Sequence, residues 1–258
     1  MDLKLKDKIA IVGGASMGIG YGIARTLAAE GAKVAMTARR EPALSEAAKK
    51  LCAAGADVLP VQADCRRVED CKRVVETVAA AWGGVDILVN NDGAPPLGDI
   101  MTLDDIAWQK AIEQNLMYVV RMVREAVPHM VRRGGGSILN ITAISAMQPY
   151  AGFALSVASW GGVIGYAKTL SIELAPSGIN VNTICPGYID TTRLEKVFSA
   201  GGQDPSVMRN QLISQVPMGR IGTVDDVANL VALLVSARGN YITGTTIQVD
   251  GGLLKHVR

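Results

Sequence analysis

Short apolar runs, bounded by glycine, proline or polar residues, alternate along the chain with longer stretches in which apolar residues recur every three or four positions. The short runs are typical of buried strands, which we expect at residues 8–14, 33–39, 57–64, 85–92, 136–143, 179–187 and 246–252. The longer stretches predict helices at 19–31, 41–55, 67–82, 103–132, 153–176 and 223–236. This alternation predicts an α/β fold: one doubly wound parallel sheet with helices on both faces.

We see no linker, internal repeat or low-complexity segment, so the pattern predicts a single domain over residues 1–258. Residues 190–222 depart from the alternation and are richer in glycine, proline and polar residues. They follow the strand at 179–187, and ligands of open α/β sheets lie beyond the carboxyl ends of the strands. We therefore predict that 190–222 form a substrate lid.

Composition argues against several other classes of protein. Hydrophobic residues make up 49% and charged residues 19%, as in a compact globular protein. The net charge of +2 and the 4% of aromatic residues give no basis for nucleic-acid binding, and no apolar run approaches a membrane span. The four cysteines lack CxxC spacing and the two histidines lie far from other ligands, so we expect reduced thiols and no metal site. With no signal-peptide cleavage pattern, we expect a cytoplasmic protein.

The first predicted strand runs into a glycine-rich turn, GGASMGIG, at residues 13–20. Gly14, Gly18 and Gly20 lack the side chains that would keep a pyrophosphate from the backbone, and the helix that follows presents its N–H groups and dipole to the charge. A tight strand–helix turn alone would need glycine too. The strand before, the helix after and the second strand about 20 residues on favour a dinucleotide site.

The second strand ends in TARR, where a side chain meets the adenosine ribose of a dinucleotide. An acidic residue there would bind the 2′-hydroxyl of NAD, whereas arginine would pair with the 2′-phosphate of NADP. Ala38 takes the acidic position and is followed by Arg39 and Arg40. Arginines in a solvated loop would look the same, but the missing acid favours NADP(H), with NAD(H) second.

Five motifs in order resemble those of the short-chain dehydrogenase/reductase family along essentially the whole chain. They are the glycine motif GASMGIG, Asp64 after the third strand with Cys65 beside it, NNDG at 90–93, Asn115 in QNLMYVV, and Pro186-Gly187 with Thr191 downstream. The chain is most similar to members that resemble ketoacyl-carrier-protein reductases and lack the Tyr-x-x-x-Lys motif. One difference is Gly13, which stands where the family usually has a threonine.

The resemblance implies a Rossmann-like seven-stranded sheet and a homotetramer, or a dimer, packed through the helices at about 103–132 and 153–176. It implies cofactor contacts at Gly14, Ser16, Gly18, Ile19, Gly20, Arg39, Arg40, Asp64, Cys65, Asn91, Gly93, Pro186, Gly187, Ile189 and Thr191. The implied partner is a small-molecule substrate.

The family's catalytic serine, tyrosine and lysine fall on Ala143, Ser156 and Trp160. Tyrosine is the usual proton donor because the lysine ammonium lowers its pKa. Ser156 is a much weaker acid, and Trp160 carries no charge. Lys168 lies two helical turns further on, about 12 Å away at 1.5 Å per residue, and cannot replace the lysine.

Several groups could replace the missing acid: Ser156, Ser145, or a water held by Asn115. The dienoyl-CoA reductase branch of the family carries its tyrosine at the position of Ser145, but it keeps the lysine. Tyr150 and Tyr188 could also face the cleft; we assign them, with Trp160, to the lining of the substrate pocket.

Two functions follow from these positions. The first is an NADP(H)-dependent oxidoreductase acting on a carbonyl or alcohol, such as a β-ketoacyl or enone compound, with a non-standard proton donor. The second is an NADP-binding homologue without net redox turnover, such as a lyase, a hydrolase or a regulatory protein. The intact cofactor motifs favour the first.

Overall fold

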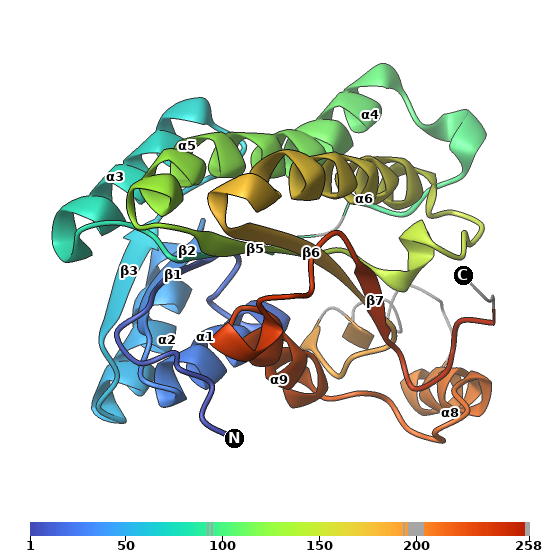
Figure 1. The fold of residues 1–258 in the computed structure, drawn as a ribbon. Coiled ribbons are helices and arrows are strands. Elements are labelled where there is room, and N and C mark those ends of the chain that lie inside the picture. The colour runs from blue at the N-terminus through green and yellow to red at the C-terminus, as the bar shows by residue number, and fades with distance from the viewer. Residues whose placement is uncertain (92, 94, 193, 196–203, 256–258) are drawn as a thin grey trace.

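A computed structural model of the protein describes residues 1–91, 93, 95–192, 194–195 and 204–255. Seven strands form one parallel sheet in the order β3-β2-β1-β4-β5-β6-β7 (Figure 1). Their bounds are β1 Ile9–Val12, β2 Lys33–Ala38, β3 Val58–Gln62, β4 Ile87–Asn90, β5 Gly136–Ile141, β6 Ile179–Pro186 and β7 Thr246–Val249. This confirms the predicted doubly wound sheet.

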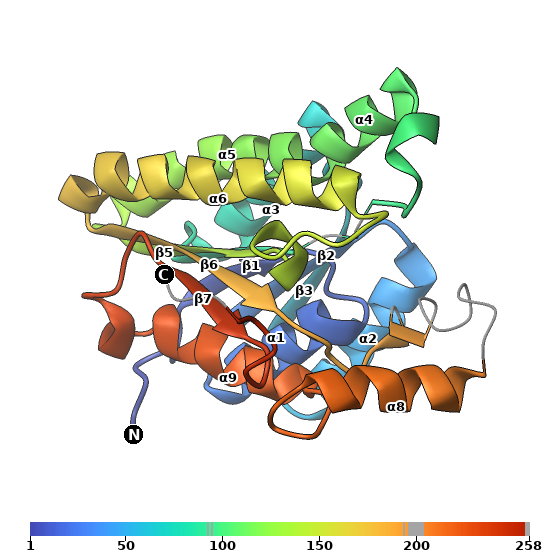
Figure 2. The ribbon, with the colours of Figure 1, turned by 90° about the vertical axis from the view of Figure 1, so that its right-hand side faces the viewer.

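Helices cover both faces of the sheet, as Figures 1 and 2 show. On one face lie α1 (Gly18–Ala29), α2 (Glu41–Ala53) and α9 (Val224–Leu234). On the other lie α3 (Val68–Trp82), α5 (Tyr118–Arg132) and α6 (Ala154–Leu174). Two further helices, α4 (Asp105–Ile112) and α8 (Pro205–Gln215), lie at the end of the molecule toward which the central strands run.

Each face of the sheet buries its own apolar core because the central strands carry hydrophobic side chains on both sides. Toward α1, α2 and α9 the core includes Ile23, Leu27 and Met36. Toward α3, α5 and α6 it includes Leu88 and Met122. All five of these side chains are fully buried, so the strands keep a fixed register and hold the loops at their carboxyl ends in place.

The strand order reverses between β1 and β4. After β3 the chain crosses back over the sheet and adds β4 on the other side of β1, so the connections leaving β1 and β4 diverge. Such a switch point leaves a crevice beyond the carboxyl ends of the strands, where ligands of open α/β sheets bind.

The predicted helix at 103–132 is interrupted, so this part of the prediction was wrong in detail. It begins at Asp105 and contains a π-helical segment, Glu113–Met117, between α4 and α5. The spacing of apolar residues cannot reveal one π-helical turn, because the apolar stripe of the helix continues on the far side of that turn. The segment 190–222 contains α8. Its last residue, Gly222, forms an isolated bridge with Ile189, which precedes the segment. Residues 193 and 196–203 lie outside the described part of the chain.

None of the helices in the described residues is both long and apolar enough to cross a membrane.

Candidate active site

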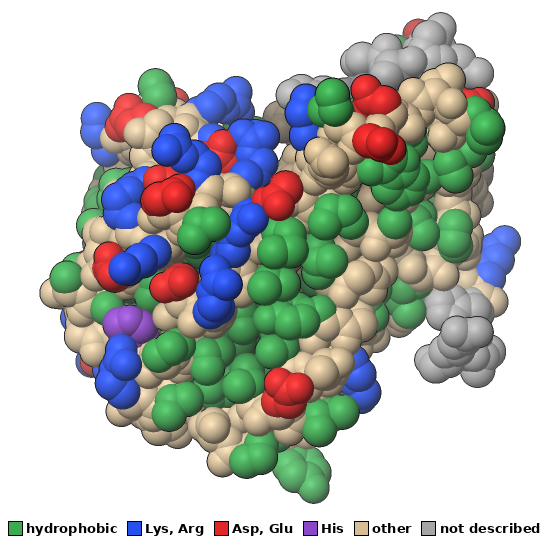
Figure 3. All heavy atoms as spheres, turned by 90° about the horizontal axis from the view of Figure 1, so that it is seen from above, with side chains coloured by type: hydrophobic (Ala, Val, Ile, Leu, Met, Phe, Trp, Pro, Cys, Tyr) green, Lys and Arg blue, Asp and Glu red, His purple; other side chains and the backbone are tan. Residues whose placement is uncertain are grey.

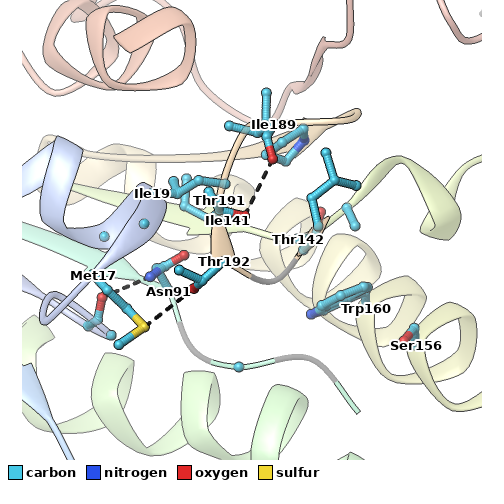
Figure 4. Close-up of a pocket in the computed structure, with 18 of the residues that line it drawn as sticks. Met17, Ile19, Asn91, Ile141, Thr142, Ser156, Trp160, Ile189, Thr191 and Thr192 are labelled. Carbon is cyan, nitrogen blue, oxygen red and sulfur yellow. Dashed lines mark hydrogen bonds between the residues drawn. The ribbon is translucent and has the colours of Figure 1, made fainter. Parts of the chain in front are cut away.

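A cavity of about 900 Å³ opens beyond the carboxyl ends of β1, β4, β5 and β6 (Figure 4). Of the residues predicted to contact a cofactor, it is lined by Gly14, Ser16, Gly18, Ile19, Gly20, Arg39, Arg40, Cys65, Asn91, Gly93, Pro186, Gly187, Ile189 and Thr191. The residues predicted for chemistry or substrate that also line it are Ser145, Tyr150, Ser156, Trp160 and Tyr188. One continuous cavity therefore joins the dinucleotide end to the predicted reaction centre.

In the glycine turn between β1 and α1, Gly14 and Gly20 leave no room for a side chain. Gly14 and Gly18 have φ angles of +56° and +57°, which favour glycine. A Cβ on Gly14 would lie 2.7 Å from the carbonyl oxygen of Asn91, and one on Gly20 would lie 2.7 Å from the Asn91 side-chain nitrogen. That nitrogen donates to the Gly13 carbonyl oxygen at 3.0 Å, which ties β4 to the turn. The bare N–H groups at the start of α1 fit a pyrophosphate.

The side chain of Tyr118 occupies the space into which a larger residue at position 13 would extend. A Cβ on Gly13 would collide with the Tyr118 hydroxyl. That buried hydroxyl accepts a hydrogen bond from the Asn91 backbone N–H at 3.2 Å. Tyr118, at the start of α5, therefore braces the loop after β4 from the side, in the space that a larger residue at position 13 would need.

At the adenosine end, both arginines line the cavity but Asp64 does not. Asp64 accepts from the Arg66 guanidinium at 2.7 and 2.5 Å, and this pairing holds the pKa of its carboxyl below the usual range. The neighbouring Cys65 does line the cavity. Arg40 contacts the Met17 sulfur at 3.8 Å, so its guanidinium lies against the glycine turn. The two arginines give this end of the cavity a positive charge.

The wall formed after β6 is also built from close backbone approaches. A Cβ on Gly187 would lie 2.8 Å from the Asp250 Cβ, so the Pro186-Gly187 turn passes tightly beside the end of β7. Thr191 donates through its hydroxyl to the Ile189 carbonyl oxygen at 3.4 Å. Figure 4 shows Ile189 and Thr191 on the segment that follows β6, where Thr192 contacts the Met17 sulfur of the glycine turn at 3.8 Å.

The three replaced positions, Ala143, Ser156 and Trp160, all line the same cavity. Ser156 and Trp160 are one turn apart on α6, as the i, i+4 spacing predicts, and Figure 4 shows both side chains there. Trp160 is partly exposed, whereas Ser156 is 1% exposed. The two positions to which the resemblance assigns a tyrosine and a lysine thus present a short hydroxyl and a neutral ring.

Asn115 lies in the π-helical segment and does not itself line the cavity. With its side-chain oxygen facing the nearby donors, Oδ1 accepts from Trp160 Nε1 at 3.2 Å and from Ser159 Oγ at 2.8 Å, while Nδ2 donates to the Gly93 carbonyl oxygen at 3.1 Å. The opposite orientation would set two N–H donors against each other. The amide therefore fixes the indole to the loop after β4.

The hydroxyls of Ser145 and Ser156 are buried and have no hydrogen-bond partner within the described residues. Leaving a buried hydroxyl unpaired costs roughly 1–3 kcal/mol of stability, so an unpaired hydroxyl is unusual in a folded protein. Both are in residues that line the cavity.

Two tyrosines meet at the outer part of the cavity. Their hydroxyls lie close enough for each to shift the pKa of the other. Burial is the main cause that raises the pKa of Tyr188 to about 12, and it raises the pKa of Tyr150 as well. The Tyr150 ring also meets Phe153 edge to face, with ring centroids 5.9 Å apart.

Sequence reasoning missed several residues that shape the site. Phe153, Ile144 and Leu212 contribute apolar wall, Tyr118 braces the glycine turn, and Gln148 donates to the Tyr150 hydroxyl. Gln148 and Tyr150 stand two apart in QPY, which was visible in the sequence. Leu212 lies on α8, whose polar sequence gave no sign that it reaches the cavity.

The chain is similar to known proteins over nearly its whole length. Residues 14–254 match the family model described as enoyl-(acyl carrier protein) reductase. The chain is 36% identical over 248 residues to the 3-oxoacyl-[acyl-carrier-protein] reductase FabG of Staphylococcus epidermidis, covering 96% of this chain and 99% of the relative. It is 35% identical to dehydrogenase/reductase SDR family member 4 of Homo sapiens, covering 96% and 88%.

Among solved structures, L-sorbose reductase from Gluconobacter frateurii, complexed with NADPH and L-sorbose, has a TM-score of 0.95 at 35% identity and full coverage of both chains. A variant of actinorhodin polyketide ketoreductase with NADPH has a TM-score of 0.91 at 34% identity, covering 96% and 97%. Both similarities span the cavity as well as the sheet, and the match to the family model leaves out only the chain ends. The chain belongs to the short-chain dehydrogenase/reductase family.

Proposed function

We propose that the protein is an NADP(H)-dependent oxidoreductase that interconverts a carbonyl and an alcohol on a small-molecule substrate, using a non-standard proton donor. The observation that carries this is one cavity in which a turn with glycines at 13, 14, 18 and 20 continues into a pocket lined by hydroxyls and apolar side chains. Relatives named as 3-oxoacyl-[acyl-carrier-protein] reductase and L-sorbose reductase support the reaction class.

The described residues fit NADP(H). The glycine turn would hold the pyrophosphate, Arg39 and Arg40 the 2′-phosphate, and Asn91, Ile189 and Thr191 the nicotinamide half. No carboxylate stands at Ala38 to bind a 2′-hydroxyl, so NAD(H) is the weaker ligand. Asp64 is engaged with Arg66 and would reach an adenine only after that pair opens.

When bound, the nicotinamide supplies or accepts the hydride. The chain's own residues bind the substrate and exclude water. Ile144, Phe153 and Leu212 form apolar wall, and Tyr150, Trp160 and Tyr188 line the substrate end. Ser145 and Ser156 supply polar contacts for the substrate oxygen after a rotation about χ1, and Asn115 holds Trp160 in place. The apolar wall suits a β-ketoacyl or enone compound.

The test is a panel of ketones, β-ketoacyl thioesters and enones, with NADPH oxidation and alcohol formation measured together. We expect stoichiometric turnover of at least one class and a dissociation constant for NADPH at least tenfold below that for NADH. Binding of NADPH without oxidation by any substrate would contradict the proposal.

A second function, NADP binding without net redox turnover, is favoured by one observation: all three catalytic positions are replaced in the wall of an otherwise complete cavity. The double variant Ser156→Tyr, Trp160→Lys separates the two. If the scaffold still presents the cofactor to a substrate, we expect ketone reduction to rise by about 10²–10⁴-fold, the usual share of a general acid. Each single variant is the control; no gain in the double variant supports the second function.

We also propose that the protein assembles as a homotetramer, or a dimer, through α4–α5 and α6, and that the segment 190–222, as far as it is described, covers the substrate end. Figure 3 shows hydrophobic side chains gathered on the face formed by these helices. Among them Ile172 is 70% exposed. A cytoplasmic location stays a prediction.

A further inference from the structure

The proposed reaction needs a proton on the substrate oxygen, and one hydroxyl of the cavity is arranged to supply it. We propose that Tyr150 is the proton donor, and that Gln148 and Tyr188 are positioning residues that orient its hydroxyl. The inference rests on the proposed function, since it assigns a catalytic residue to that reaction.

Tyr150 is held at the cavity rather than free in a loop. It lies between the 3-10 helix Ile144–Ala146 and the start of α6, and its ring packs with Ile144, Val216 and Leu253. The edge-to-face contact with Phe153 fixes the ring from a second side. Its side chain is only partly buried, so the hydroxyl can be reached from the cavity that it lines.

The hydrogen bond to the Tyr150 oxygen leaves its proton available. Gln148 Nε2 donates to it at 3.2 Å, and an amide N–H cannot act as acceptor. Tyr188 lies close enough for its hydroxyl to lower the pKa of Tyr150. Because Gln148 donates to the Tyr150 oxygen, the Tyr150 O–H can point to a ligand in the cavity.

The other hydroxyls of the cavity are less suited. Ser145 and Ser156 are 3% and 1% exposed, and alkyl hydroxyls are much weaker acids than phenols. Thr142 donates to the Ile184 carbonyl oxygen at 3.2 Å. Burial raises the pKa of Tyr188 to about 12, which makes it a weak acid. Among these hydroxyls, Tyr150 therefore combines access from the cavity with an orientation that allows it to donate.

The step balances with the cofactor as reductant. The carbonyl carbon gains a hydride and its C=O π bond breaks, so the oxygen becomes an alkoxide. The Tyr150 O–H bond breaks as the new alcohol O–H forms. The phenolate that remains accepts hydrogen bonds from Gln148 and Tyr188, which offset its negative charge. Water then returns a proton to Tyr150, and in the alcohol-to-carbonyl direction the same phenolate acts as the base.

The experiment compares Tyr150→Phe with wild type, using the best carbonyl of the panel. We expect kcat to fall about 10²–10⁴-fold while KM changes less than about threefold. Tyr241→Phe, at a fully exposed position, is the matched control and should leave both unchanged. NADPH affinity and thermal unfolding of the Phe variant show that its cavity is intact.

A second measurement does not depend on turnover. Titration of tyrosinate absorbance, as wild type minus Tyr150→Phe, gives the Tyr150 pKa directly. We expect the wild-type rate of reduction to fall with rising pH through that same value. In Tyr188→Phe both should move to higher pH, because the phenolate loses a donor. The titratable groups acting on this hydroxyl are Tyr188 and Asp250, and both are included in the wild-type value.

A Tyr150→Phe protein with unchanged kcat, or a pH profile that does not follow the tyrosinate titration, overturns the donor role while the proposed function stands. A wild type that reduces no carbonyl overturns both.

Discussion

Tyr118 and Gly13 form a matched pair at the residue scale. The tyrosine hydroxyl fills the space in front of Gly13 and receives the Asn91 backbone N–H, so the loop after β4 is tied to α5. A threonine at position 13 would normally brace the turn in this family, but here it would strike the hydroxyl. A side chain at position 13 would therefore meet Tyr118, 105 residues further along the chain, and also the Asn91 carbonyl oxygen, 2.7 Å from a Cβ there.

Gly13→Thr should weaken both folding and cofactor binding. Overpacking a closed backbone wall costs about 1–3 kcal/mol, and the shift of Asn91 would disturb the dinucleotide cradle. We expect lower stability in urea unfolding and an NADPH dissociation constant raised at least tenfold. In a Tyr118→Gly background, Gly13→Thr should cost less than it does in wild type, because only the close approach to the Asn91 carbonyl oxygen then remains. Gly161→Ala, with open space around an exposed helical glycine, is the control; additive effects of Gly13→Thr and Tyr118→Gly would contradict the pairing.

At the element scale, α9 shows how a polar pattern fixes a helix start. Thr223 caps it, accepting from the Asp226 backbone N–H at 3.2 Å, while the Asp226 carboxylate accepts from the Thr223 N–H at 2.7 Å. Arg220 adds two bonds to the same carboxylate, at 2.7 and 2.9 Å. The helix packs its buried residues, such as Val227 and Val231, against the core beside α1, so this cap helps to hold the sheet face behind the glycine turn.

Asp226→Asn should destabilise the protein in a pH-dependent way. The Arg220 guanidinium and the Thr223 N–H hold the pKa of Asp226 well below its ordinary value of 3.8. A depressed folded-state pKa stabilises above the unfolded value and loses this contribution as pH falls through the folded value. At pH 7 we expect the free energy of unfolding, measured with urea, to be about 0.5–2 kcal/mol lower in the variant than in wild type. This difference between the two proteins should become smaller below about pH 4. Asp7→Asn, at an exposed position, is the control; a difference that does not change with pH would contradict this origin.

The same elements show what sequence could and could not predict. The strands were predictable because β1, β4 and β5 are apolar on both faces and end in polar or glycine-rich turns. The π-helical turn at Asn115 was not, because one wide turn leaves the periodicity on either side intact. Nor was the contact of Tyr150 with Tyr188, since it joins a loop before α6 to the turn after β6, and only the folded sheet sets that distance.

At the scale of the whole molecule, the face formed by α5 and α6 carries large exposed hydrophobic side chains. Ile172 on α6 and Val131 on α5 are 70% and 48% exposed, and Figure 3 shows hydrophobic side chains running along this face. Burying such groups against a second copy would remove their apolar area from water, the main favourable contribution to association.

Ile172→Glu should therefore shift the protein toward smaller species. We expect wild type to elute as a tetramer or dimer in size-exclusion chromatography with light scattering, and the variant to lose mass by half or more because a carboxylate would be buried unpaired. Val207→Glu, an equally drastic change on α8, should have no such effect. A wild type that is monomeric at micromolar concentration would refute the assembly.

The hydrogen bond between Trp160 and Asn115 has an optical consequence. It holds a tryptophan in the wall of the cofactor cavity, while the other two, Trp82 and Trp108, do not line that cavity. Tryptophan emits where reduced nicotinamide absorbs, so bound NADPH should quench Trp160 by energy transfer. Trp160 thereby gives the protein an intrinsic fluorescent reporter of its own ligand.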